Sequence, residues 1–246
     1  MIRFKSFDEA RATRTHKVNQ EGRENWISRY FVATREEPAQ PMGFLVEKKA
    51  HDVVYPHFHD VNQFQVIVGG YGKLGRFPVR PFSMHYTNGF TGYGPITGED
   101  EGIAFFTLRN RWDSGAKYLP KQRSEMKPAP KRVRMAVNLP LSDEVARQAR
   151  RDTALETLIE PEADGLASWF LRVPPGGKME GPSPEAGGGQ YVIVAGGTLE
   201  HADRAFGRLA LGYVPTEAGP LPVQAGPDGV ELLVMQFPDR EARPPA

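Results

Sequence analysis

Two segments of this chain, 127 residues apart, share one pattern. Residues 63–70 read QFQVIVGG and residues 190–197 read QYVIVAGG, so in both an apolar run stands between a leading Gln and a Gly pair. Three further matches keep the same order: residues 44–46 with 170–172, 92–95 with 212–215, and 100–103 with 227–230. Ordered self-similarity of this kind predicts an internal duplication, in which each half of the chain folds into a similar unit.

Short Val- and Ile-rich runs are separated by turn-forming residues along the whole chain. The 246 residues include 26 Gly and 22 Pro, which are spread between the apolar runs. Val and Ile favour strands whereas Gly and Pro interrupt them, so this punctuation is typical of many short strands joined by turns. The predicted fold class is therefore all-β.

The segment between the two repeats differs in composition. Residues 118–140 are rich in Pro and basic side chains, which indicates a connector. Apolar residues then recur near helical spacing, and Ser142 is a candidate helix cap. We therefore predict a helix over residues 142–160. The expected regions are an N-terminal unit (1–118), a linker with the helix (119–164) and a C-terminal unit (165–246).

Composition also argues against several classes of function. The 31 Lys and Arg nearly balance the 30 Asp and Glu, so no global field attracts nucleic acid or an anionic membrane. No apolar run is long enough to span a bilayer, and residues 1–8 lack the apolar core of a signal peptide, so we expect a cytoplasmic protein. Because the chain has no Cys, a transition metal would have to be held by His, carboxylate or amide oxygen.

The pair His57 and His59 is the clearest candidate for chemistry. It follows Val53, Val54 and Tyr55, a stretch that favours a strand. Alternate residues of a strand point to the same face, so both imidazoles are expected to point together. Two neutral imidazoles side by side are suitable ligands for a divalent metal and need only one or two further donors.

These residues resemble the first motif of the cupin superfamily, which reads His-x-His, three or four residues, Glu, six residues, Gly. His57, His59 and Gly70 match that motif, but Gln63 stands where the family has Glu. The second cupin motif is matched only loosely by residues 95–101, where one residue is inserted and the expected His is absent. Through the duplication, the resemblance implies a bicupin, that is, two tandem cupin-type (jelly-roll) β-barrels joined here by the predicted helix.

The resemblance further implies that His57 and His59 bind metal and that Gln63 takes the place of the usual carboxylate ligand. We expect Glu101, which aligns with the missing His, to restore a carboxylate, with Glu99, Asp100 and His85 as alternatives. Two His and one carboxylate form the facial triad of non-haem Fe(II) oxygenases, so Fe2+ is favoured over Mn2+, Ni2+ or Zn2+. In the second repeat, Pro184 and Ala186 stand opposite the two histidines, so no metal is expected there.

Two classes of function remain open from the sequence. The first is a metal-dependent bicupin enzyme that acts on a small organic substrate, with a dioxygenase-type oxidoreductase favoured. The second is a metal-free bicupin that binds or senses a small molecule without catalysis, which Gln63 and the missing His favour. No nucleic-acid partner is expected, and a homodimer is left open. Metal analysis of the purified protein separates the two classes.

Overall fold

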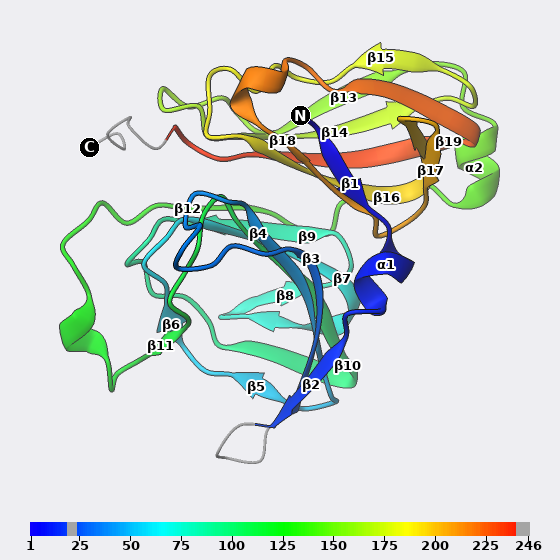
Figure 1. The fold of residues 1–246 in the computed structure, drawn as a ribbon. Coiled ribbons are helices and arrows are strands. Elements are labelled where there is room, and N and C mark those ends of the chain that lie inside the picture. Colours follow the sequence, from blue (N-terminus) through cyan, green and yellow to red (C-terminus); the bar gives the residue numbers. More distant parts are fainter. Residues whose placement is uncertain (19–23, 240–246) are drawn as a thin grey trace. The chain divides into compact units, whose positions relative to one another are not determined.

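The computed structural model describes residues 1–18 and 24–239, and the fold is all-β, as the sequence predicts. The chain divides into two compact units (Figure 1). The N-terminal unit is Ala10–Leu139, and the C-terminal unit is Met1–Glu9 together with Pro140–Ala246. Each unit is built on a large antiparallel sheet of the cupin jelly-roll type. None of the helices in the described ranges is long and apolar enough to cross a bilayer.

The N-terminal unit contains a nine-stranded sheet in the order β12-β9-β7-β10-β4-β3-β2, with β5 paired to β10 and β8 to β7. A separate two-stranded sheet pairs β11 with β6. The elements are β2 (Thr15–Val18), β3 (Glu24–Phe31), β4 (Met42–Lys48), β5 (Val53–Val54), β6 (His57–Phe58), β7 (Gln63–Leu74), β8 (Phe77–Val79), β9 (Ser83–Thr87), β10 (Ile96–Arg109), β11 (Lys117–Tyr118), the 3-10 turn η1 (Arg123–Glu125) and β12 (Val133–Ala136).

The C-terminal unit contains an eight-stranded sheet in the order β1-β18-β16-β19-β14-β13, with β15 paired to β19 and β17 to β16. A short helix, α1 (Phe7–Arg11), spans the boundary between the units. The elements are β1 (Arg3–Lys5), α2 (Glu144–Gln148), β13 (Ala154–Ile159), β14 (Ala167–Val173), β15 (Lys178–Glu180), β16 (Gln190–His201), β17 (Arg204–Phe206), β18 (Leu211–Val214), the 3-10 turn η2 (Thr216–Ala218) and β19 (Pro222–Gln236).

The central strand pairs of the two units repeat each other at a constant offset. In the N-terminal unit Gln65 lies opposite Thr107, and in the C-terminal unit Val192 lies opposite Val234, so each partner is shifted by 127 residues. The Gly pairs that end both apolar runs coincide with register shifts in the two ladders. The 127-residue repeat of the sequence is therefore also a repeat of strand register.

Two of the smaller sequence matches are wrong in detail. Phe44 lies opposite Thr107 and Trp169 lies opposite Val234, so Phe44 corresponds to Trp169 rather than to the neighbouring Phe170. In the same way, the pairing of β18 with β16 aligns Gly212 with His85 and not with Gly92. The first match is displaced by one residue and the second by seven, and in both cases only the ladder hydrogen bonds define the register.

The helix predicted over residues 142–160 is largely wrong. Asp143 caps α2 by accepting a hydrogen bond from the Ala146 amide at 2.8 Å, but α2 ends at Gln148. Residues 154–159 instead form the edge strand β13, because their main chain pairs with β14. Pairing with a neighbouring strand here overrides an apolar spacing that also suits a helix.

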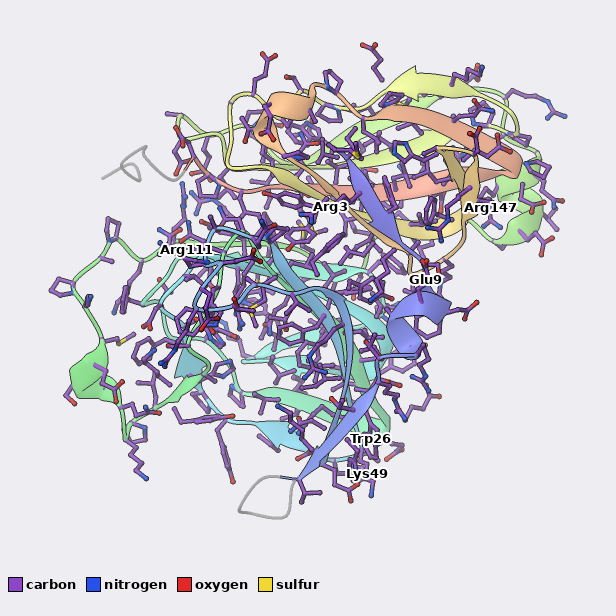
Figure 2. The ribbon with its side chains drawn as sticks, in the orientation of Figure 1. Arg3, Glu9, Trp26, Lys49, Arg111 and Arg147 are labelled. Carbon is purple, nitrogen blue, oxygen red and sulfur yellow. The ribbon has the colours of Figure 1, made fainter. Side chains whose placement is uncertain are left out.

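Two basic residues, Arg147 of α2 and Arg150 just after it, have partners within the C-terminal unit. Arg147, labelled in Figure 2, donates from Nε to the Asp228 carbonyl at 3.1 Å. Arg150 donates to the buried carboxylate of Glu231 at 3.3 Å. These contacts hold the short helix against β19. Residues 119–139, expected in the linker, belong to the N-terminal unit, where β12 pairs with β9.

The matched interiors of the two units differ in polarity. Core residues of the C-terminal unit are apolar on β14, β16 and β19. In the N-terminal unit some of the corresponding positions are apolar as well, including Ile67, Ile103 and Phe105, but others are buried and polar. Gln65 matches Val192, His85 matches Gly212 and Thr107 matches Val234, and the buried charge of Arg109 matches the neutral amide of Gln236. Because buried polar groups are costly unless paired, this contrast places the candidate site in the N-terminal unit.

The bulge after each apolar run requires a Gly, and this requirement can be tested at Gly70. Gly70 has φ +70°, and a Cβ at this position would stand 2.1 Å from the Gly102 carbonyl oxygen. We expect Gly70→Ala to lower the free energy of unfolding by about 2 kcal/mol in urea titrations. Gly207→Ala is the control, since nothing lies within 4 Å of its added Cβ. Equal effects of the two substitutions would contradict this account.

Candidate functional site

His57 lies between two neighbouring segments of the N-terminal unit. Its backbone exchanges hydrogen bonds with Tyr93 on one side, at 3.1 and 3.0 Å, and it pairs with Tyr118 of β11 on the other. Residues directly opposite each other in such ladders share a face, so the three side chains lie on the same side. The ring centroid of His57 is 4.4 Å from that of Tyr93 and 5.7 Å from that of Tyr118.

The hydrogen bonds of His57 define its tautomer. Its Nδ1 lies 2.7 Å from the Tyr55 carbonyl oxygen, which can only accept, so Nδ1 carries the proton. Nε2 therefore has a lone pair, and it accepts from the Tyr93 hydroxyl at 2.6 Å. This ring is buried and held at both nitrogens.

His59 is oriented by a carboxylate. Its Nδ1 lies 2.8 Å from Oδ2 of the buried Asp113, so Nδ1–H donates and Nε2 keeps its lone pair. Nη2 of Arg109 is 3.2 Å from Nδ1 and 3.1 Å from Nε2 of the same ring. The in-plane bonding directions of the two ring nitrogens point away from each other, so no single atom can lie along both. Because Nη2 of Arg109 is nearly equidistant from both nitrogens, it lies over the face of the His59 ring.

Gln63 joins the two histidines through Arg109 and Tyr93. Its Oε1 accepts from Nε and Nη2 of Arg109, at 3.2 and 3.1 Å. That contact assigns Nε2 of the amide to the other side, where it donates to the Tyr93 hydroxyl. The result is a directed chain of hydrogen bonds, in which Arg109 donates to Gln63, Gln63 to Tyr93, Tyr93 to His57, and His57 to the carbonyl of Tyr55.

His85 lies deeper in the same interior. It is 2% exposed, its ring centroid is 4.9 Å from that of Tyr93, and neither ring nitrogen has a hydrogen-bond partner among the described residues. The same is true of Oε1 of Gln65, which lies opposite His85 in the ladder. A cavity of about 10 Å³ adjoins both residues, which is room for about one water molecule.

Glu101 is not part of this interior, contrary to the sequence-based expectation. It is exposed, as are Glu99 and Asp100, and all three lie where the register of β10 against β7 shifts. Asp100 faces His51 on the surface, with Oδ1 3.2 Å from Nε2. In the match to the second cupin motif, one inserted residue aligned Glu101 with the expected His. In the structure that segment forms a bulge that points outwards.

Burial keeps the histidines of this centre neutral. Burial, together with the nearby His59, lowers the pKa of His57 to about 4. Burial and the neighbouring His57 lower the pKa of His85 to about 3. Burial would raise the pKa of Asp113, but the hydrogen bond from His59 and the charge of Arg109 hold that pKa below its ordinary value. The centre thus contains one cation and one anion among neutral donors and acceptors.

The donors of this centre do not fit a divalent metal ion. His57 and His59 each present Nε2, but Gln63 is neutral and is already bonded to Arg109. Among residues 1–18 and 24–239, no group of three or more His, Cys, Asp and Glu side chains is arranged to hold a metal ion. The ligand set predicted from the sequence is therefore not assembled.

The charge of Arg109 also disfavours an ion at His59. A metal bound about 2.1 Å from Nε2 would lie no more than about 5 Å from Nη2 of Arg109. At an effective dielectric constant near 20, a doubly charged ion would be repelled by roughly 6 kcal/mol at that distance. Asp113 offsets part of this repulsion, but its charge is shared with Arg109 itself, Nη1 of which is 3.1 Å away.

A cavity of about 850 Å³ opens beside His57. Its lining includes Tyr55 and Tyr118, which are 45% and 43% exposed and which both contact His57. The Lys48 ammonium in its wall is bonded to Asn25 and paired with Asp52. The lining residues are Asn25, Lys48, Val53, Val54, Tyr55, Tyr118, Leu119, Lys121, Gln122 and Glu125.

Sequence reasoning missed Arg109, Asp113 and Tyr93. One signal was present for Arg109: in β10 it continues the alternation of Ile103, Phe105 and Thr107, so a charged residue ends a face that is otherwise uncharged. Asp113 follows the strand by four residues and gave no such signal. In the C-terminal unit, Pro184 and Ala186 lie outside the strands.

Comparisons with known proteins support the fold. No protein-family model and no curated protein matches the sequence. Among solved structures, the chain is similar to a candidate dioxygenase of Nostoc punctiforme, with a TM-score of 0.66 and 13% identity over 98% of this chain and 84% of that one. It also resembles Lactobacillus farciminis oxalate decarboxylase in a formate complex, with a TM-score of 0.58 and 13% identity over 96% of this chain and 86% of that one. A third similar structure is an Escherichia coli pirin in complex with nickel(II), with a TM-score of 0.56 and 11% identity over 97% of this chain and 100% of that one. At such identities these likenesses establish a cupin-type fold and nothing finer.

The lowered pKa values predict a loss of stability in mild acid. Unfolded histidine binds a proton below about pH 6.5, whereas His57 stays neutral in the folded protein down to about pH 4. Stability is therefore lost as pH falls through this window, by about 1.4 kcal/mol per pH unit for each such histidine. His85→Met should make the slope shallower by about that amount in urea unfolding from pH 7 to about 4.5. An unchanged slope would refute the buried, neutral state of His85.

Proposed function

We propose that the N-terminal unit binds a small organic molecule in the 850 Å³ cavity without a resident metal. The observation that carries this proposal is the junction between the cavity and the polar centre. Tyr55 and Tyr118 line the cavity, and both contact His57, the last side chain of the hydrogen-bond chain. Binding in the cavity is thereby connected to the chain of hydrogen bonds that runs from Arg109 to His57.

The lining favours a planar aromatic acid. The two half-exposed tyrosines offer flat aromatic faces, and Val53, Val54 and Leu119 add apolar wall. Two of the lining side chains, Lys48 and Lys121, are cationic and one, Glu125, is anionic. Because Lys48 is already paired with Asp52, Lys121 is the cation that we expect to pair with the carboxylate of such a ligand. The volume is in the range of ordinary ligand sites.

A metal-dependent enzyme is the second candidate function, and one observation favours it. His57 and His59 both donate from Nδ1, to a carbonyl and to a carboxylate, and both leave Nε2 as the acceptor. Metal-binding histidines are usually anchored in this way. The missing third ligand and the charge of Arg109 weigh against this candidate.

The cavity can be tested with simple aromatic acids. We expect benzoate and 4-hydroxybenzoate to bind in isothermal titration calorimetry, and Tyr118→Ala to weaken that binding up to about tenfold through loss of an aromatic contact. Tyr71→Ala is the matched control, because Tyr71 is similarly exposed, at 50%, and is not part of the cavity lining. Unchanged affinity in Tyr118→Ala, or equal losses in both variants, would overturn the assignment.

A further inference from the structure

We propose that the guanidinium of Arg109 is the resident cation of the N-terminal interior, and that Arg109 and Gln63 together exclude divalent metal ions from His57 and His59. This inference goes beyond ligand binding in the cavity, because it assigns a function to two residues that do not line it. It also does not depend on which ligand the cavity binds.

Arg109 is committed to this centre by its contacts. Its side chain is 5% exposed and lies over the face of His59. Nε and Nη2 donate to one oxygen of Gln63, and Nη1 pairs with Asp113. The arginine therefore interacts with the carboxylate that orients His59 and with the amide that is linked to His57 through Tyr93. These are two places where a metal ion would need negative charge.

An amide at position 63 suits this arrangement better than a carboxylate. Gln63 accepts from Arg109 with Oε1 and donates to the Tyr93 hydroxyl with Nε2. A carboxylate has no donor for Tyr93, so it would break the directed chain at this point. The two residues are thus complementary. Arg109 supplies the charge, and Gln63 accepts from Arg109 and donates to the Tyr93 hydroxyl.

The repeat contains a natural comparison for this pair. At the offset of 127, Gln63 and Arg109 correspond to Gln190 and Gln236, which also lie opposite each other. Gln190 donates to Oε1 of Gln236 at 2.9 Å, so the side-chain contact is kept without a charge. The contact is thus a feature of both units, whereas the cation is found only in the unit that contains the two histidines.

Metal binding by matched variants tests the proposal. Purified wild-type protein would be incubated with Fe2+ under anaerobic conditions, or with Mn2+, Ni2+ or Zn2+, dialysed, and measured by plasma mass spectrometry. We expect the wild type to retain only substoichiometric metal. Gln63→Glu should stay metal-free, because the introduced carboxylate would pair with Arg109. The double variant Gln63→Glu/Arg109→Gln should bind about one ion per chain, as two His and one carboxylate do elsewhere.

The controls separate this proposal from the cavity assignment. Gln190→Glu makes the same exchange in the unit without the histidines and should bind no metal, and His57→Ala should abolish metal binding in the double variant. A wild type that retains one ion, and loses it in His57→Ala, would overturn the proposal. A folded double variant without metal would also overturn it. If that variant does not fold, Gln63→Glu/Arg109→Met takes its place: it should bind about one ion per chain and lose it in His57→Ala. The wild-type metal measurement tests the proposal in either case. Benzoate titrations test the cavity assignment alone, so the two proposals can fail independently.

Discussion

The buried guanidinium of Arg109 is the interaction on which the interior of the N-terminal unit depends. A charge removed from water is tolerated only where partners satisfy it, and here Asp113, Gln63 and the face of His59 do so. Each partner then restricts the next. Asp113 sets the tautomer of His59, and Gln63 can point its amide nitrogen only towards Tyr93, which in turn must donate to His57. One arginine is therefore linked to both histidines through the groups that orient them.

The duplication shows what a cupin-type unit requires and what it leaves free. Both units keep the strand register, the Gly bulges and a buried aromatic pair, Phe64 with Tyr86 and Tyr191 with Tyr213. They differ at some inward positions, where the C-terminal unit has apolar residues and the N-terminal unit has buried polar groups beside its own apolar cluster. Burial of an apolar interior stabilises the fold directly, whereas each polar group in an interior needs its own hydrogen-bond partner. The apolar interior therefore suits a structural core, and the polar interior suits binding.

Much of the architecture could be predicted from the sequence because it depends on local patterns. The apolar runs ending in Gly pairs indicated strands, their repetition indicated two units, and the alternation at His57 and His59 placed both rings on one face. The helix over 142–160 failed because Leu155, Leu158 and Ile159 suit either a helix or an edge strand, and only pairing with β14 decides between them. Glu101 failed because a bulge turned it outwards, and a bulge depends on the partner strand.

The sequence by itself determined the fold class, the repeat and the two histidines that point inwards, since strand propensity and two-residue periodicity depend only on near neighbours in the chain. Only the tertiary structure decided what surrounds those histidines. Arg109 lies 50 residues and Asp113 lies 54 residues from His59 along the chain, yet both contact it. The pairing of β10 with β7 brings Arg109 and Asp113 close to His59, and no local pattern records which distant side chains then meet. For that reason the sequence suggested a metal centre, whereas the folded chain has an arginine there.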